Sequence, residues 1–421
     1  MEAIYIHGGI ALQGQVKIQG SKNAVLPVMA ATLLTGDVCE IDNCPKLTDV
    51  YHMQKLLVSL GCLVTRDKER LKIDSAKVDI LHALSGMPQD AVRGMRSSII
   101  LLGALLGRIG EVQMEYPGGC VIGSRPIDVH LAVLKEMNVV FEEKSYGLYA
   151  TTTGLRGADI SLRISSVGAT ENLVLAAVCA EGTTVIRNAA KEPEIVTLCE
   201  FLNMCGADIT GEGSSVIIIK GVKELRGVKY AIPGDRIVAG TYLCACMAAG
   251  GEVLLKQAPC NQMEAVLQYA EKMGVGFQKT EEGLYVQVHD SLKAPDQLVT
   301  EPYPGFPTDM QSPFVSVLAG AEGRCLVKEN IFENRFHTVP CLNDMGANIV
   351  QIDSRTILVE GVEHLHGYTV TAKELRGGAA LVIAGIAAKG ETVVDGCSYI
   401  ERGYENICRD LRELGVRIYG V

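Results

Sequence analysis

Residues 171–221, ENLVLAAVCAEGTTVIRNAAKEPEIVTLCEFLNMCGADITGEGSSVIIIKG, hold one copy of the pattern from which the chain is built. A helix rich in small residues ends at Gly182, and the short β-rich run TTVIRNA follows it. An amphipathic helix then ends at Gly206, where glycine readily adopts the left-handed cap conformation. The remaining residues have the composition of two paired strands. The stretch therefore predicts a helix, a strand, a second helix and two strands.

The same pattern recurs along the chain with a period of about 70 residues. Glycine ends the first helix of every copy, at positions 36, 110, 182, 250, 323 and 390. The second helix also ends at glycine, except in the second copy, where Asn138 is the usual substitute. A further strand leads into each following copy. We therefore expect an α/β fold of six βαβαββ repeats.

The length of the chain predicts two domains. A chain of 421 residues is too long for one hydrophobic core, because single cores stop growing near about 250–300 residues. We expect three repeats in a domain of residues 21–229, which carries the loop around Cys120. The other three repeats form a domain of residues 1–20 and 230–421, which carries Asp309. The N-terminal strands are expected to complete the last repeat and so close the chain on itself.

Charge and composition exclude several classes of protein. A net charge of −10 argues against a general binder of nucleic acid or of membrane surfaces. No apolar run reaches the length of about 18 residues that a transmembrane helix needs, and the start MEAIYIHGGI does not resemble a secretory signal. The 14 cysteines form no CxxC pair and no Cys/His metal pattern. These observations predict a cytoplasmic protein with free thiols and without a metal.

Four of the six first helices are expected to begin with a cation. A cation at this position faces the positive end of the helix dipole, which is unfavourable by about 0.3–1 kcal/mol. A bound phosphate or carboxylate would reverse the sign of that effect. In a chain of net charge −10 we favour local anion sites over the alternative that these side chains simply point into water. The four cations are Lys22, Arg96, Arg236 and Arg376.

The first helix of the third repeat begins without a cation. Its sequence, SSVGATEN, brings Ser166 and Gly168 to the helix start. Backbone N–H groups at such a start suit a diphosphate. A plain N-cap by Ser166 or Thr170 explains the same residues equally well.

Cys120 lies in the stretch EYPGGCVIGSRPIDVH, behind two glycines and five residues before Arg125. One interpretation is a small hydrophobic residue in a turn. The other is a thiol tuned by the nearby cation, on a glycine-rich loop that opens and closes over a cleft. Such a thiol serves as a nucleophile or as a general acid.

Asp309 lies among prolines in PYPGFPTDMQSPF, just before the fifth of these first helices. It is expected to be either an N-cap or a general base that contacts a substrate hydroxyl. Arg335 and Arg402 occupy corresponding places in successive repeats, in IFENRFHTV and YIERGYENI. The repetition argues against two solvated charges.

Several short motifs, in this order along the chain, resemble the UDP-N-acetylglucosamine 1-carboxyvinyltransferase family of enolpyruvyl transferases. The similarity extends from about residue 4 to the end, and its specificity comes from the whole set of motifs rather than from any single one. The motifs are GSKNA, PGGC-x-I-G-x-RP-x-D-x-H, SVGAT, FPTDMQ, FENRF, LR-x-x-A-x-LV-x-AG and ERGYE.

The resemblance implies a two-domain inside-out α/β barrel with three repeats in each domain and an active site between them. It implies transfer of the enolpyruvyl group of phosphoenolpyruvate to the 3-hydroxyl of UDP-N-acetylglucosamine, with release of phosphate, as the first committed step of peptidoglycan synthesis. It implies neither metal nor organic cofactor. It also implies covalent inhibition by fosfomycin, an epoxide that resembles phosphoenolpyruvate.

The resemblance also implies roles for individual residues. Cys120 matches the loop thiol that protonates the phosphoenolpyruvate methylene, and Asp309 matches the base for the sugar hydroxyl. Lys22, Arg125 and Arg402 match the cations around the phosphate. Arg335 and Arg376 match two further arginines of the active site. The residues that match the UDP-sugar site are Asn23, Arg96, Arg125, Pro126, Ile127, Asp128, Val129, Ser166, Val167, Gly168, Asp309 and Ile331.

Two positions depart from the family pattern. Ile164 stands where some members carry a lysine near the nucleotide, so the resemblance does not extend to that contact. Glu374 stands where many members have Asp, two residues before Arg376, which changes the reach of the carboxylate.

Three alternatives share some of these features. The first is 5-enolpyruvylshikimate-3-phosphate synthase, which has the same repeats and the same donor; Asn23 and the PGGC loop favour the UDP-sugar acceptor instead. A second is a non-catalytic paralogue that senses phosphoenolpyruvate or a nucleotide sugar. The presence of Cys120, Asp309 and Lys22 argues against this alternative. RNA 3′-phosphate cyclase uses a related repeat, but the acidic chain argues against it.

Overall fold

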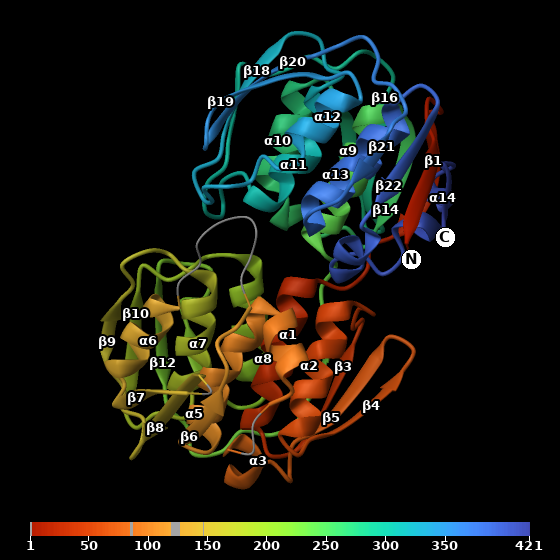
Figure 1. Ribbon diagram of the computed structural model, residues 1–421. Helices are drawn as coiled ribbons and strands as arrows, with labels where there is room; N and C mark the ends of the chain where they lie inside the picture. Colours follow the sequence, from red (N-terminus) through yellow and green to blue (C-terminus); the bar gives the residue numbers. More distant parts are fainter. Residues whose placement is uncertain (1, 85–86, 119–126, 146) are drawn as a thin grey trace. The chain divides into compact units, whose positions relative to one another are not determined.

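The computed structural model describes residues 2–84, 87–118, 127–145 and 147–421 (Figure 1). Cys120, Arg125 and Pro126 lie outside the described residues. The described chain divides into two compact units by its internal contacts. Residues 2–19 and 234–421 form one, called here the Asp309 unit, and residues 20–118 and 127–233 form the other, called the Lys22 unit. Each unit is described by itself.

The third repeat has the order of elements that the sequence predicts. Its strands form one sheet in the order β11-β12-β10-β9, in which β9 runs parallel to β10 and the other neighbours are antiparallel. The parallel pair is joined through a helix, as a parallel connection requires. The elements are β9 (Asp159–Ser161), α7 (Val167–Ala177), β10 (Thr183–Arg187), α8 (Pro193–Met204), β11 (Asp208–Thr210) and β12 (Val216–Lys220).

The fifth and sixth repeats, in the Asp309 unit, follow the same plan. The fifth consists of β17 (Gln297–Val299), the 3₁₀ turn η4 (Thr308–Met310), α11 (Gln311–Leu318), β18 (Arg324–Lys328), α12 (Val339–Asp344), β19 (Asn348–Asp353) and β20 (Thr356–Glu360). The sixth consists of β21 (Thr369–Thr371), α13 (Leu375–Ala387), β22 (Glu391–Asp395), the 3₁₀ turn η5 (Cys397–Arg402), α14 (Ile407–Glu413) and β23 (Arg417–Gly420).

The second repeat departs from the plan among the described residues. Two short helices, α3 (Ile80–Leu84) and α4 (Gln89–Gly94), precede its first helix where the other repeats have a leading strand. Its sheet has three strands in the order β6-β8-β7. The remaining elements are the 3₁₀ turn η2 (Arg96–Ile100), α5 (Leu101–Arg108), β6 (Glu111–Met114), α6 (Asp128–Lys135), β7 (Val139–Lys144) and β8 (Gly147–Thr152).

The first and fourth repeats exchange their leading strands. The strand β2 (Leu12–Lys17) precedes the first repeat but pairs in parallel with the first strand of the fourth, and β13 (Lys229–Ala231) precedes the fourth repeat but pairs with the first strand of the first. The first repeat has α1 (Lys22–Ala31), η1 (Thr32–Leu34), β3 (Val38–Asp42), α2 (Thr48–Ser59), β4 (Leu63–Asp67) and β5 (Arg70–Asp74). The fourth has α9 (Arg236–Ala249), β14 (Gly251–Lys256), η3 (Cys260–Gln262), α10 (Glu264–Lys272), β15 (Gly276–Lys279) and β16 (Gly283–Val288).

This exchange corrects one expectation about the N-terminus. The strand β1 (Ala3–His7) lies between β22 and β23 and completes the last repeat, as predicted. The following strand β2 was expected in the same place, but it belongs to the sheet of the fourth repeat. The reason is that the chain passes from the Asp309 unit to the Lys22 unit after residue 19. The strand β2 therefore belongs to the Asp309 unit, whereas the helix α1 that follows it belongs to the Lys22 unit.

Each unit has its own hydrophobic core, built around the first helices of its repeats. In the Asp309 unit α9, α11 and α13 contact one another, and in the Lys22 unit α5 contacts both α1 and α7. Almost every residue of α9 and α13 is buried, as expected for helices that are apolar on all sides. Figure 1 shows the sheets outside these helices within each unit. This is the inside-out α/β barrel that the resemblance to the family implies.

Two predictions about composition can be compared with the described residues. All 13 described cysteines are free thiols. Within the described ranges, no helix combines the length and the hydrophobicity needed to cross a membrane.

Candidate functional site

The cation at the start of α1 is paired inside the protein. Ser21 is the N-cap, and its hydroxyl accepts a hydrogen bond from the Ala24 N–H at 3.3 Å. Lys22 follows, and its Nζ lies 2.6 Å from Oδ2 of Asp49 in the first turn of α2. The two side chains are only 11% and 3% exposed. The interpretation of Lys22 as a solvated charge is therefore wrong.

The cations at the starts of α9 and α13 follow acidic N-caps. Asp235 accepts hydrogen bonds from the N–H groups of Ile237 and Val238, and Glu374 accepts them from Arg376 and Gly377. These carboxylates offset the positive helix ends, so Arg236 and Arg376 can be buried beside them. The longer Glu374 side chain thus still caps its helix.

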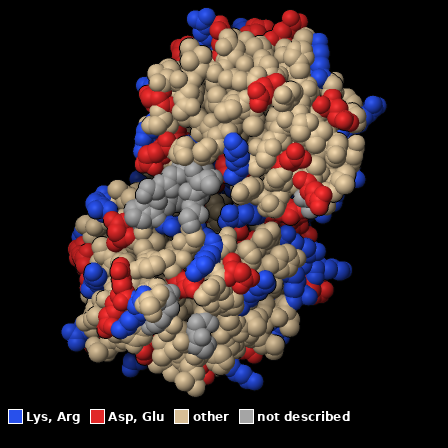
Figure 2. Space-filling model, viewed as in Figure 1, with Lys and Arg blue, Asp and Glu red and all other residues tan. Residues whose placement is uncertain are grey.

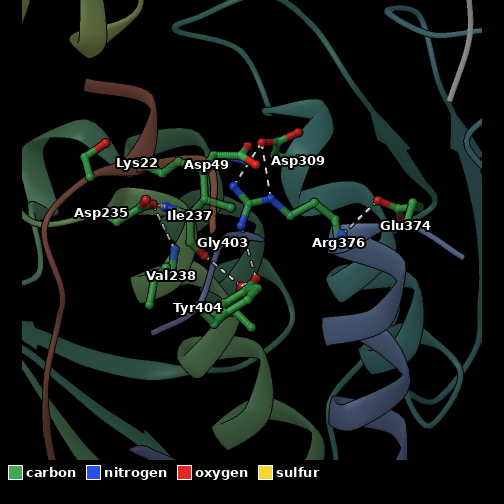
Figure 3. A network of polar contacts seen from close by, with 12 residues as sticks. Lys22, Asp49, Asp235, Ile237, Val238, Asp309, Glu374, Arg376, Gly403 and Tyr404 are labelled. Atoms are coloured by element: carbon green, nitrogen blue, oxygen red, sulfur yellow. Dashed lines mark hydrogen bonds and ion pairs between the residues drawn. The ribbon is translucent and has the colours of Figure 1, made fainter. Parts of the chain in front are cut away.

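Asp309 lies between two buried guanidinium groups. Its Oδ1 accepts from Nη2 of Arg335 at 2.9 Å, and its Oδ2 accepts from Nε and Nη2 of Arg376 at 3.3 and 3.2 Å. The arginine side chains are 1% and 5% exposed, whereas the Asp309 side chain is 28% exposed. Figure 3 shows Arg376 reaching from α13 to this carboxylate. The cluster presents a carboxylate to solvent and keeps its counterions inside.

The expectation that Asp309 is an N-cap is wrong. The residue lies in η4, whose N-cap position is Pro307, and no side chain caps that turn. The carboxylate turns to the arginines instead, because those charges attract it more strongly than neutral N–H groups do.

Tyr404 extends the cluster behind Arg376. Its hydroxyl accepts from Nη1 of Arg376 at 3.3 Å and lies 2.8 Å from Oγ1 of Thr241 on α9 (Figure 3). Burial alone lowers the pKa of Arg376, but Tyr404, Asp309 and Asp235 together raise it above its usual value. Burial raises the pKa of Tyr404. Arg376 is thus fixed in place and permanently charged.

A buried carboxylate joins the Asp309 turn to the segment that carries Arg335. Glu329 is fully buried, and its Oε1 accepts from the N–H groups of Ile331 and Phe332 at 2.9 and 3.1 Å. Its Oε2 accepts from the hydroxyl of Thr308 at 2.9 Å, next to Asp309. Nε and Nη1 of Arg335, by contrast, are buried without a hydrogen-bond partner among the described residues.

Gln19 holds the turn that carries Arg402. Its Nε2 donates to the Gly403 carbonyl at 3.1 Å, and its Oε1 accepts from the Glu405 N–H at 2.8 Å. Gln19 is buried, and Arg402 is the last residue of η5, where it is partly buried. A residue near the N-terminus thus fixes a turn near the C-terminus.

In the Lys22 unit, the helix α7 begins with Ser166, and not Thr170, as its N-cap. The Ser166 hydroxyl accepts from the Ala169 N–H at 3.4 Å. Thr170 is not a cap, because its hydroxyl donates to the Ser166 carbonyl at 2.8 Å. Val167 and Gly168 occupy the first turn of the helix and are partly exposed.

The remaining predicted residues lie near helix starts or in loops. Asn23 is the second residue of α1, Arg96 is the first residue of η2, and both are partly buried. Ile127 and Ile331 are partly buried, Val129 is buried, and Asp128 is exposed and forms an ion pair with Arg163. Ile164 is 55% exposed, so the departure from the family pattern leaves an apolar side chain in solvent.

The charged residues of these sites are local features in an acidic molecule. Figure 2 shows acidic side chains spread among the basic ones over the visible face, in keeping with the net charge of −10.

Comparisons with known proteins identify the family. A family model described as EPSP synthase (3-phosphoshikimate 1-carboxyvinyltransferase) matches residues 6–411. A protein of Caldanaerobacter subterraneus subsp. tengcongensis, named UDP-N-acetylglucosamine 1-carboxyvinyltransferase 2, is 46% identical over 98% of each chain. A UDP-N-acetylglucosamine 1-carboxyvinyltransferase of Granulibacter bethesdensis is 44% identical over 99% of each chain. The chain belongs to the UDP-N-acetylglucosamine 1-carboxyvinyltransferase family. The resemblance inferred from the motifs is thereby confirmed.

Solved structures agree on the fold of this family. The enolpyruvyl transferase NikO from Streptomyces tendae matches with a TM-score of 0.88 at 24% identity, over 99% of this chain and 98% of that one. EPSP synthase from Acinetobacter baumannii matches with a TM-score of 0.75 at 17% identity over the whole of both chains. At these identities the likeness supports the fold alone.

Within each unit, the structure brings together some of the residues predicted for the UDP-N-acetylglucosamine 1-carboxyvinyltransferase family. Asp309, Arg335 and Arg376 form one hydrogen-bonded cluster. Sequence reasoning missed Glu329 and Gln19. Glu329 directly follows the strand β18 and lies outside the quoted motifs. Gln19 gave no signal, because its partners are 384 and 386 residues away.

Proposed function

We propose that this protein transfers the enolpyruvyl group of phosphoenolpyruvate to the 3-hydroxyl of UDP-N-acetylglucosamine and releases phosphate. The observation that carries the proposal is the Asp309 carboxylate, which is partly exposed while two buried guanidinium groups hold it. The family's curated members bear the name of this reaction. The reaction would be the first committed step of peptidoglycan synthesis, and we place the protein in the cytoplasm.

Asp309 acts as the general base. The Asp309 side chain is 28% exposed, whereas the guanidinium groups that hold it are buried, so the carboxylate can be reached from solvent. A sugar hydroxyl within hydrogen-bond reach can therefore deliver its proton there while its oxygen attacks C2 of phosphoenolpyruvate. The fixed arginines keep the carboxylate in one orientation during this step.

Cys120 acts as the general acid. As the O3–C2 bond forms, the phosphoenolpyruvate methylene at C3 takes a proton from the thiol, which gives a tetrahedral intermediate. In the second half, C3 returns a proton to the Cys120 thiolate, the C2–O bond to phosphate breaks, and the proton held by Asp309 leaves with the phosphate. The net change exchanges the sugar hydroxyl proton for the enolpyruvyl group.

Cations bind the donor and stabilise the charge of the leaving phosphate. Lys22, Arg125 and Arg402 take this role, with Arg335 and Arg376 near the base. Lys22 is held by Asp49 at 2.6 Å, which fixes its ammonium group before substrate arrives. The nucleotide sugar is bound by Asn23, Arg96, Arg125, Pro126, Ile127, Asp128, Val129, Ser166, Val167, Gly168, Asp309 and Ile331.

We expect the same thiol to react with fosfomycin. The Cys120 thiolate would open the epoxide, forming a C–S bond as the C–O bond breaks and the oxygen takes a proton. Peptide mapping by mass spectrometry should find the added mass on Cys120 alone. Modification of any other cysteine with Cys120 intact would assign the reactive thiol elsewhere.

One assay tests the proposed function. The protein is mixed with phosphoenolpyruvate and either UDP-N-acetylglucosamine or shikimate 3-phosphate, and phosphate release is measured. We expect release with the nucleotide sugar only. Faster release with shikimate 3-phosphate would favour the alternative synthase, and binding of both substrates without release would favour a non-catalytic sensor.

A further inference from the structure

His130, in the first turn of α6, packs against the start of α7. Its side chain is more than nine-tenths buried, with 8% of the residue exposed. A Cβ atom added at Gly168 would lie 2.9 Å from Cε1 and 3.3 Å from Nε2 of His130. Any side chain at position 168 would thus push the ring away. The glycine at the helix start makes room for an imidazole.

Asn172, one turn further along α7, fixes which ring nitrogen carries the proton. Its Oδ1 accepts from the Gly103 N–H at 2.7 Å, and its Nδ2 donates to the Ile99 carbonyl at 3.1 Å. Two backbone groups therefore set the orientation of this fully buried amide. The same Nδ2 lies 2.8 Å from Nδ1 of His130. Because a donor faces Nδ1, that nitrogen must accept, and the ring proton resides on Nε2.

The charge of the ring agrees with this tautomer. Burial, together with the positive charge of Arg96, lowers the pKa of His130 to about 4, while Asp128 opposes the shift. At neutral pH the imidazole is therefore uncharged, with one N–H group.

The Nε2–H group is available to a ligand. Nε2 has no hydrogen-bond partner among the residues that the structure describes, and it faces the first turn of α7. There the N–H groups of Val167 and Gly168 have no acceptor within the helix, whereas that of Ala169 is bound by Ser166. An anion at this helix end would meet several neutral donors and the positive end of the dipole.

We infer that His130, held by Asn172 with its proton on Nε2, donates that proton in a hydrogen bond to a diphosphate oxygen of UDP-N-acetylglucosamine. The inference rests on the proposed function for the identity of the ligand. It makes His130 a specificity-determining residue for the nucleotide sugar, and it explains why Gly168, Asn172 and Gly103 occur together. Arg96 contributes positive charge near the site, whereas the uncharged His130 contributes a hydrogen bond of fixed direction.

Two amide variants distinguish the role of Nε2 of His130 from that of Nδ1. His130→Gln places an amide donor near the former Nε2, whereas His130→Asn reaches only as far as Nδ1. Loss of one hydrogen bond to a charged phosphate should weaken UDP-N-acetylglucosamine binding of His130→Asn by about 10- to 150-fold. His130→Gln should stay much closer to the wild-type protein. In phosphate-release assays the KM for UDP-N-acetylglucosamine should rise in His130→Asn by far more than kcat falls, and His130→Gln should show a smaller rise.

Nitrogen-15 NMR of the wild-type imidazole gives a readout that does not depend on the variants folding. We expect Nδ1 to appear unprotonated and Nε2 protonated, with the Nε2–H signal shifting downfield when UDP-N-acetylglucosamine is added. A proton on Nδ1, or unchanged binding in His130→Asn while the wild type binds the nucleotide sugar, would overturn this inference alone. A wild-type protein that does not bind UDP-N-acetylglucosamine at all would contradict the proposed function and, with it, the ligand named here.

Discussion

Asp309 and Glu171 are two carboxyl groups beside central helices of the two units, but their surroundings differ in sign. Asp309 lies between the guanidinium groups of Arg335 and Arg376 and forms ion pairs with both. Glu171, on α7, is buried, and its burial together with the nearby Glu194 and Glu192 raises its pKa well above the usual value. The surroundings of Asp309 stabilise its charged form, whereas those of Glu171 disfavour the charged form of that carboxyl group.

The contrast extends to the helix starts of the two units. In the Asp309 unit, α9 and α13 begin with acidic N-caps followed by a buried arginine. In the Lys22 unit, α1 and α7 begin with serine N-caps, and α7 has the uncharged His130 beside it. The ion pair of Lys22 with Asp49 at the start of α1 is buried and differs from this pattern. Repeats of one structural plan thus carry different charges, and the proposals above assign proton chemistry to Asp309 and directional binding to the start of α7.

The largest effect on stability is expected from breaking the Asp309 cluster. Arg376→Met leaves Asp309 with one guanidinium partner and should lower the free energy of unfolding by about 3–5 kcal/mol. Chemical denaturation measures the change. Asp309→Asn introduced into the same chain should cost less than it does alone, because neither charge is then left without its partner. Additive costs would show that the two residues do not interact.

A smaller effect is expected from the Glu329 carboxylate. Glu329→Ala leaves the N–H groups of Ile331 and Phe332 and the Thr308 hydroxyl without their acceptor. The expected loss in free energy of unfolding is about 1–3 kcal/mol. Glu329→Gln keeps one acceptor oxygen and should lose less. If the two variants are equally stable, Glu329 does not join the two segments in the way described.

Glu171 should produce an effect that depends on pH. Its pKa is higher in the folded than in the unfolded protein, so its favourable contribution is complete below the unfolded pKa and is lost as the pH rises through the folded value. Glu171→Gln removes this dependence. Thermal unfolding between about pH 5 and pH 8 should therefore show the variant gaining stability relative to the wild type as pH rises. A constant difference would mean that Glu171 is ionised in the folded state.

The smallest effect is expected from Tyr404→Phe. The variant loses the hydroxyl that contacts Arg376 and Thr241 but keeps the ring beneath the guanidinium group, 5.6 Å away. We expect a loss of about 0.5–1.5 kcal/mol in the free energy of unfolding. A loss as large as that of Arg376→Met would place Tyr404, and not Asp309, as the main partner of Arg376.

Periodicity in the sequence was enough to predict the six repeats, because each repeat is a local pattern of helix ends and strands. It could not predict the exchange of β2 and β13, since both strands precede similar helices and only the crossing of the chain decides their partners. The cations at helix starts were found from their unfavourable positions. The sequence did not reveal that Asp309 pairs with two arginines, because Arg335 and Arg376 are 26 and 67 residues away from it.

The burial of neutral groups was not predicted either. His130 stood in a motif, but its tautomer depends on Asn172, whose own orientation depends on backbone groups of another repeat. Such chains of hydrogen bonds have no periodic signal in the sequence. The role of Cys120 stays a prediction, because that residue lies outside the described part of the chain.

One paired measurement tests the division between proton chemistry and binding most directly. UDP-N-acetylglucosamine affinity by calorimetry and the single-turnover rate of phosphate release are determined for Asp309→Asn and for His130→Asn. The account predicts that Asp309→Asn slows release by about 10²- to 10⁴-fold with a small change in affinity. It predicts that His130→Asn loses affinity, while its rate at saturation falls far less than that of Asp309→Asn. If both variants lose affinity alone, or both lose rate alone, the proposed division is wrong.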